Sequence, residues 1–145
     1  DLVMVSEKAW RTPGSRMFIE VGKQVSVEDL LKGMIIQSGN DACVTLAEHI
    51  AGTEETFAEL MNKHAEQLGM ENTHFVNSTG LPHPDHYTTA EDIAKATIAT
   101  IREFPEFYKI YAESFKGGDH LKAIQEEAQA IASAAFRAAG VGESQ

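Results

Sequence analysis

The run from Gln37 to Ala42 is the part of the sequence most informative about chemistry, because it contains the triplet Ser38-Gly39-Asn40. A serine hydroxyl is a weak nucleophile unless a base lies within hydrogen-bond reach. Apolar residues at helical spacing occur on both sides of the triplet, which places it between two predicted helices. Taken alone, the triplet is typical of a helix connection in which Asn40 caps the second helix.

Other polar clusters favour solvated surface over chemistry. His83 and His86 could bind a metal, but two prolines in their loop and the lack of a third nearby histidine favour a solvated loop. We therefore predict no metal site and no cofactor. His64 lies near an apolar stripe, where a hydrogen-bonded histidine is commoner than a ligand. An acidic face is predicted to be solvated, and it comprises Glu48, His49, Glu54, Glu55 and Glu59.

Helices account for most of the predicted structure. Ser26 with Asp29, and Thr89 with Asp92, have the spacing of a capping box, and Gly52 and Gly69 occupy helix-ending positions. The predicted helices are 27–37, one from Asn40 to Gly52, one from Thr53 to Gly69, and one from Thr89 to Phe104, followed by a short helix or turn near 107–111.

Two other segments are predicted to be extended or irregular. The runs 2–5 and 17–21 are rich in strand-forming residues and flank a polar turn at 12–15, which predicts a short hairpin or a pair of crossing extended segments. Residues 70–88 contain several asparagines, glycines and prolines, which indicates a long ordered loop.

The C-terminal part differs in composition from the rest. The glycine pair at 117–118 indicates a linker. Beyond it, residues 119–139 have an apolar residue every three or four positions and many alanines, which predicts one long thin helix ending near Gly140.

Charge and length exclude several functional classes. The 145 residues carry a formal net charge of -10, which repels nucleic acid and anionic lipid. No apolar run approaches the roughly 20 residues of a membrane span, and we expect no membrane segment and no signal peptide. The lone cysteine, Cys43, cannot form an internal disulfide.

Residues around the triplet resemble a known family. The run from Leu31 to Ala42, followed by 72–77, Gly80-Leu81 and 86–92 in that order, is similar to the penicillin-binding D-alanyl-D-alanine carboxypeptidases. The similarity extends from residue 1 to about 115. It implies a serine acyl-transfer site built from Ser-x-x-Lys, Ser-x-Asn and Lys-Thr-Gly motifs.

The resemblance assigns Ser38 to the proton relay and Asn40 to binding of the substrate amide. The nucleophile and its lysine belong to Ser-x-x-Lys, and the sequence contains neither that motif nor Lys-Thr-Gly. Ser38 and Asn40 are therefore expected to be a remnant of a site, with binding of peptidoglycan stem peptides or β-lactams lost. The family acts in the periplasm or elsewhere outside the cytoplasm.

The family context also suggests an arrangement for the whole chain. We expect a mainly α fold: a helical bundle subdomain at 1–116 with a short N-terminal hairpin, a linker at 117–118, and an appended helix at 119–140. The family places its nucleophile helix before residue 1, so the 119–139 helix is hypothesised to fill the vacated core position. Ser133 and Phe136 then stand where that helix has its serine and lysine, although a four-residue match in an alanine-rich helix is more often a chance match.

Three functions remain open on the sequence alone. The first is a non-catalytic helical fragment or scaffold derived from a D-alanyl-D-alanine carboxypeptidase. The second is an engineered binding or display module that presents the 119–139 helix to a protein partner. The third is a residual penicillin-binding enzyme acylated at Ser38 or Ser133.

Overall fold

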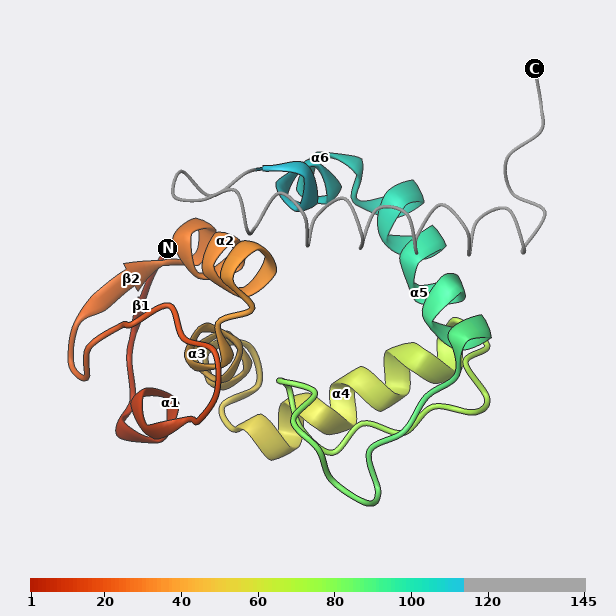
Figure 1. Cartoon of the computed structure of the whole chain (residues 1–145), viewed down its shortest axis with the longest axis horizontal. Helices are drawn as coiled ribbons and strands as arrows, with labels where there is room; N and C mark the ends of the chain where they lie inside the picture. The colour runs from red at the N-terminus through yellow and green to blue at the C-terminus, as the bar shows by residue number, and fades with distance from the viewer. Residues whose placement is uncertain (114–145) are drawn as a thin grey trace. The chain divides into compact units, whose positions relative to one another are not determined.

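A computed structural model describes residues 1–113, which fall into two compact units. The first unit comprises Asp1–His64 and His74–Tyr87. The second comprises Ala65–Thr73 and the residues from Thr88 to the end of the described part. As predicted, the chain is mainly helical: residues 1–113 form six α-helices and one two-stranded antiparallel sheet (Figure 1).

The predicted C-terminal features lie outside the described residues. These features are the linker at 117–118, the helix at 119–139 and its packing into a vacated core. Among the helices of residues 1–113, none is long and apolar enough to cross a membrane.

The N-terminal sheet differs from the prediction. Strand β1 (Leu2–Met4) pairs with β2 (Gln24–Ser26), with Val3 opposite Val25, so the predicted short hairpin is present, but its second strand is 24–26 and the predicted 17–21 was wrong. Residues 17–21 form no strand because the N–H groups of Met17 and Ile19 donate to a side chain of the first unit, described below.

A short helix that the sequence analysis did not predict follows β1. Helix α1 (Glu7–Arg11) begins after Ser6, whose side-chain oxygen accepts a hydrogen bond from the N–H of Ala9. Such a cap satisfies an N–H group that has no partner inside the helix, and it stabilises the helix by about 1 kcal/mol. Ala9 is completely buried, so α1 is also fixed by packing.

The triplet connects two helices, as predicted: α2 (Val27–Gln37) ends just before it, and α3 (Asn40–Ala51) begins at its last residue. The Ser26 hydroxyl caps α2 by accepting from the Asp29 N–H at 3.0 Å, which confirms the predicted cap. The predicted cap on α3 was wrong. Gly39 occupies the N-cap position without a side-chain bond, and Asn40 is already the first residue of the helix. The Asn40 Nδ2 donates to the Pro13 carbonyl.

Helix α3 is the central element of the first unit and lies against α1, α2 and β1. Its apolar residues are among the most buried of the chain, and each such aliphatic side chain stabilises the fold by about 1.5–3 kcal/mol. The buried cluster comprises Val3, Val5, Ala9, Ile19, Leu30, Ala42, Val44 and Leu46. The last residue of the triplet, Asn40, therefore begins a helix that packing holds in place.

Helix α4 (Glu54–Gln67) begins after Thr53, as predicted, and Gly69 follows it with a φ of 72°. The loop predicted at 70–88 is ordered. Within the first unit, the backbones of His74 and Tyr87 exchange two hydrogen bonds of 2.8 and 3.0 Å. The Asn62 side chain exchanges two more with the backbone of Phe75.

The second unit contains α5 (Ala90–Glu103), α6 (Pro105–Tyr108) and a 3-10 turn at Lys109–Ala112. The predicted Thr89 cap is confirmed by a 3.1 Å bond from the Asp92 N–H. Asp92 is 1% exposed. Its carboxyl accepts from the Asn72 N–H at 2.9 Å and the Thr73 hydroxyl at 2.7 Å, which ties the 72–73 backbone to α5.

Candidate active site

Ser38 lies on the surface, directly after the last residue of α2. Its backbone is left-handed, with φ 53° and ψ 36°, and the next N–H, that of Gly39, donates to the Gly33 carbonyl at 3.0 Å. A residue with a Cβ adopts this conformation at a cost of roughly 1–2 kcal/mol. The surrounding structure therefore imposes the turn, and the turn leaves Ser38 exposed.

Asn40 is held by both its backbone and its side chain. Its N–H donates to the Ser15 carbonyl at 2.8 Å, and its Nδ2 donates to the Pro13 carbonyl at 2.9 Å. Asn40 is thus fixed in orientation, it is 9% exposed, and its side-chain acceptor has no protein donor within residues 1–113.

The segment that holds Asn40 is itself bound to Asp41. The Asp41 carboxyl accepts from the N–H groups of Met17 at 2.8 Å, Ile19 at 3.3 Å and Ala42 at 3.0 Å. Phe18, between two of these donors, has a φ of 63° and a side chain that is 83% exposed. One buried carboxyl therefore determines the path of the backbone next to the triplet.

Two glycines allow these segments to approach closely. At Gly14, where φ is 87°, an added Cβ would lie 2.6 Å from Nδ2 of Asn40. At Gly39 an added Cβ would lie 3.0 Å from the Gly33 carbonyl oxygen and 3.2 Å from Cβ of Met17. A side chain at either position would displace a neighbour of the triplet.

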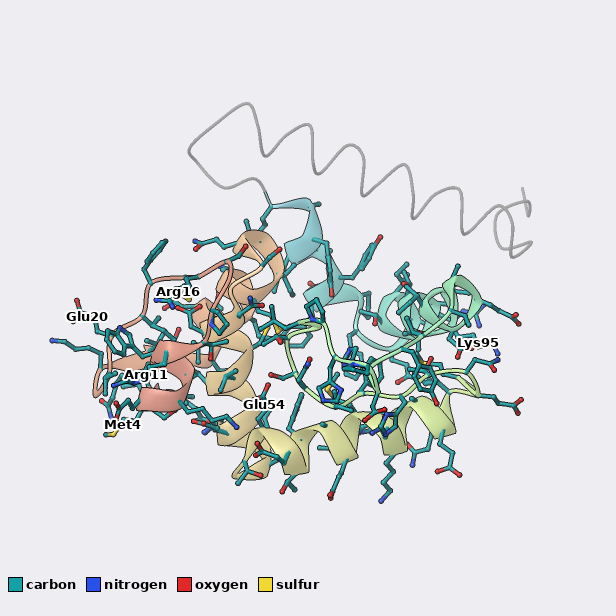
Figure 2. All side chains as sticks on the ribbon, turned by 60° about the horizontal axis from the view of Figure 1, so that its bottom comes forward. Met4, Arg11, Arg16, Glu20, Glu54 and Lys95 are labelled. Atoms are coloured by element: carbon teal, nitrogen blue, oxygen red, sulfur yellow. The ribbon has the colours of Figure 1, made fainter. Side chains whose placement is uncertain are left out.

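A shallow recess of about 420 Å³ lies in the first unit, beside the segment that holds Asn40. Its walls come from α1, the 12–13 segment, the start of α4 and the 77–81 loop, and Figure 2 labels two of the wall residues, Arg11 and Glu54. The residues that line it are Lys8, Arg11, Thr12, Pro13, Glu54, Asn77, Thr79 and Leu81. Pro13 belongs both to this wall and to the contacts of Asn40.

The charges at the recess pair with one another. Lys8 contacts Glu54 at 3.3 Å and Glu55 at 2.9 Å. The hydrogen bond to Glu55 raises the pKa of Lys8, and the same bond lowers the pKa of Glu55. The prediction of a solvated face was wrong for Glu54, whose side chain is 14% exposed and accepts from both the N–H and the hydroxyl of Ser78.

Cys43 lies one turn into α3 and has a partly buried thiol. Burial, and secondarily the charge of Asp41, raises the pKa of Cys43 to about 11. Only the thiolate is a good nucleophile. The raised pKa therefore disfavours the thiolate of Cys43 at neutral pH.

The histidines of the 74–87 loop make local hydrogen bonds. Nδ1 of His86 accepts from the Val76 N–H at 3.1 Å, and Nδ1 of His83 accepts from the Asp85 N–H at 3.1 Å. Burial lowers the pKa of His86, followed by the charges of His74 and His83. In the part of the chain that the structure describes, no three metal-binding side chains are grouped so that they could hold an ion.

Comparisons with known proteins identify the family of this chain. The sequence model of the D-alanyl-D-alanine carboxypeptidases matches residues 1–132, and the chain belongs to that family. The match continues past residue 115, where the sequence analysis placed the end of the similarity.

Individual relatives agree with the family match. The chain is 47% identical over 116 residues to D-alanyl-D-alanine carboxypeptidase DacA of Haemophilus influenzae. It is 48% identical over 119 residues to DacC of Escherichia coli. Each alignment covers 78% of this chain and 30% of the relative, so the chain spans less than a third of the length of these proteins.

Solved structures show the same relationship. The crystal structure of DacD from Francisella tularensis superimposes with a TM-score of 0.75 at 48% identity, covering 77% of this chain and 27% of that one. Penicillin-binding protein 5 from Haemophilus influenzae gives a TM-score of 0.75 at 46% identity, covering 78% and 34%.

The sequence analysis named Ser38 and Asn40 but missed the residues that hold them. Pro13 and Ser15 were assigned only to a turn, and Asp41 received no role. The presence of Asp41 directly after the triplet was an available signal. Nothing in the local sequence, however, connected it with Met17 and Ile19.

Proposed function

We propose that this chain supplies the Ser-x-Asn part of a D-alanyl-D-alanine carboxypeptidase active site. In that role Ser38 joins the proton relay and Asn40 binds the amide of a peptidoglycan stem peptide or a β-lactam, outside the cytoplasm. The observation that carries the proposal is that one loop contains both an exposed Ser38 and an Asn40 of fixed orientation. The amide oxygen of Asn40 has no protein donor within residues 1–113.

The chemistry of the pair supports this assignment. An amide oxygen with a fixed direction can accept from a peptide N–H, and the exposed hydroxyl can both donate and accept. Groups oriented in advance need no reorganisation during reaction, which is a large part of catalytic stabilisation. The 48% identity to DacC of Escherichia coli supports the same role.

We further propose that the 145 residues alone are not catalytic. An acyl-serine intermediate needs an activated serine, and the sequence contains no Ser-x-x-Lys or Lys-Thr-Gly motif. A fluorescent penicillin mixed with the chain, followed by mass spectrometry, is expected to leave the mass unchanged. A stoichiometric adduct on Ser38 or Ser133 would show instead that the chain is a penicillin-binding enzyme by itself.

The role of the Ser-x-Asn motif is tested by transplanting part of the chain into a relative. Residues 1–113 replace the matching segment of DacC of Escherichia coli, and the chimera is assayed for acylation by labelled penicillin and for release of D-alanine from a D-Ala-D-Ala peptide. We expect both activities to be present, and we expect Ser38→Ala and Asn40→Ala to reduce them.

A matched pair of substitutions distinguishes a site effect from a folding effect. Ser38→Ala removes an exposed hydroxyl, and Ser78→Ala removes the Ser78 hydroxyl that donates to Glu54. We expect Ser38→Ala to slow acylation at least tenfold and Ser78→Ala to leave it within about twofold. Equal acylation rates for Ser38→Ala and the unsubstituted chimera would contradict the proposal.

A further inference from the structure

We propose that Asp41 is the positioning residue of this site, acting on Asn40 through the backbone of residues 13–19. The inference rests on the proposed function for its relevance to catalysis, but its structural content can be tested without any activity. Asp41 does not face the ligand: it is 1% exposed.

The first step is the set of donors on Asp41. Its Oδ1 accepts from Met17 and Ala42, and its Oδ2 accepts from Ile19. Both carboxyl oxygens therefore accept hydrogen bonds. Oδ2 binds only the 17–19 segment, whereas Oδ1 binds both that segment and the first turn of α3. The carboxyl fixes that segment to the helix that begins with Asn40.

The second step links the same segment to the site. The carbonyls of Pro13 and Ser15 accept from the side chain and the backbone of Asn40. Ser15 and Met17 are separated by one residue, so a displacement at Met17 is transmitted to the carbonyl of Ser15. The orientation of Asn40 thus depends on contacts made by its neighbour in sequence, Asp41.

The third step explains why the residue is an aspartate. An asparagine at 41 has one acceptor oxygen, and its NH2 group would face a backbone N–H. One of the bonds to Met17 or Ile19 would then be lost, leaving a buried N–H without an acceptor. Alanine has no side-chain oxygen. Glutamate has two, but its longer side chain would place them farther from the helix.

Asp92 provides a matched control in the second unit. It is also 1% exposed, lies in the first turn of a helix, and accepts from a loop N–H, that of Asn72. None of its contacts involves residues 13–19 or 38–41. A substitution at Asp92 should therefore perturb a buried carboxyl of the same kind without reaching Asn40.

The test uses nitrogen-15 NMR and hydrogen exchange on the 145-residue chain with Asp41→Asn and Asp92→Asn. We expect Asp41→Asn to shift the side-chain NH2 signals of Asn40 and to accelerate exchange of its backbone N–H at least tenfold relative to Asp92→Asn. Unchanged Asn40 signals and exchange in a folded Asp41→Asn chain would overturn the proposal.

A measurement on the unsubstituted chain covers the case in which Asp41→Asn does not fold. Hydrogen exchange is followed at increasing urea concentrations. The N–H groups of Met17, Ile19 and Asn40 should open together, with the same dependence on urea, because one set of contacts holds all three. Continued protection of Asn40 after Met17 and Ile19 exchange would overturn the proposal. Neither result depends on penicillin, so failure here is distinct from failure of the chimera.

Discussion

Gly33 of α2 lies directly against the side chain of Met17. A Cβ added at Gly33 would lie 2.8 Å from Cγ and 3.2 Å from Cβ of Met17. Met17 is the residue whose N–H donates to Asp41. The absence of a side chain on the middle of α2 is therefore part of what allows the 13–19 segment to reach the triplet.

Gly33→Ala is expected to destabilise the chain, although alanine is the better helix former by about 1 kcal/mol. Crowding against Met17 should outweigh that gain, because overpacking of this kind costs about 1–3 kcal/mol. The measurement is urea unfolding followed by circular dichroism.

The double variant supplies the control for Gly33→Ala. In a Met17→Ala background the crowding is removed, so adding Gly33→Ala should be neutral or stabilising. Equal destabilisation in both backgrounds would show that contact with Met17 is not the cause.

Phe18→Gly is expected to stabilise the chain by about 0.5–1 kcal/mol, because glycine adopts a positive φ without the steric cost that phenylalanine has. Part of the gain is lost because glycine makes the unfolded chain more flexible. The side chain is 83% exposed, so little burial is lost. Phe18→Ala retains a Cβ and should change stability much less. A lower urea midpoint for Phe18→Gly than for Phe18→Ala would contradict this account.

Local signals were sufficient for most helices but not for the contacts of the site. The caps at Ser26, Thr53 and Thr89 each involve an N–H three residues away, so the sequence shows both partners together. The cap predicted at Asn40 failed because Asn40 is the first helical residue and Gly39 is the N-cap, and the Asn40 side chain bonds to Pro13, 27 residues earlier in the chain.

The predicted strand at 17–21 failed for the same physical reason. Met17, Phe18 and Ile19 have strand propensity, but Met17 donates to Asp41, 24 residues away, and this contact overrides propensity. Ser38 and Asn40 could be named from the sequence because their motif is contiguous. Asp41 could not be given its role, because that role exists only after folding.

Cys43 is expected to react slowly with iodoacetamide. At pH 8 a pKa of about 11, against an ordinary value of 9.0, makes the thiolate roughly 100-fold scarcer, and because a thiolate of higher pKa is more nucleophilic, alkylation should slow by roughly tenfold or more. Mass spectrometry measures the rate in native buffer and in urea. Similar rates in the two conditions would show that the thiol is not protected by the fold.

Asp92 is expected to contribute to acid sensitivity. The Thr73 hydroxyl, followed by the Asn72 N–H and Lys95, lowers the pKa of Asp92 below its ordinary value of 3.8. The contribution is therefore fully present above pH 3.8 and is lost as the pH falls through the lowered value.

Urea unfolding at pH 6 and pH 3 measures this contribution. The unsubstituted chain should lose more stability between the two pH values than Asp92→Asn does. Thr73→Val, which removes the main cause of the shift, should fall between them. An identical loss in the chain and in Asp92→Asn would exclude Asp92 as a source of acid sensitivity.

The most direct test of the central claim is the acylation rate of the DacC chimera carrying residues 1–113, measured with a fluorescent penicillin, with and without Asn40→Ala. The account predicts that the chimera is acylated and that Asn40→Ala slows acylation at least tenfold. Urea unfolding should show that the Asn40→Ala chimera is still folded under the conditions of the assay. A folded Asn40→Ala chimera that is acylated as fast as the unsubstituted one would contradict the assignment of this loop to the active site.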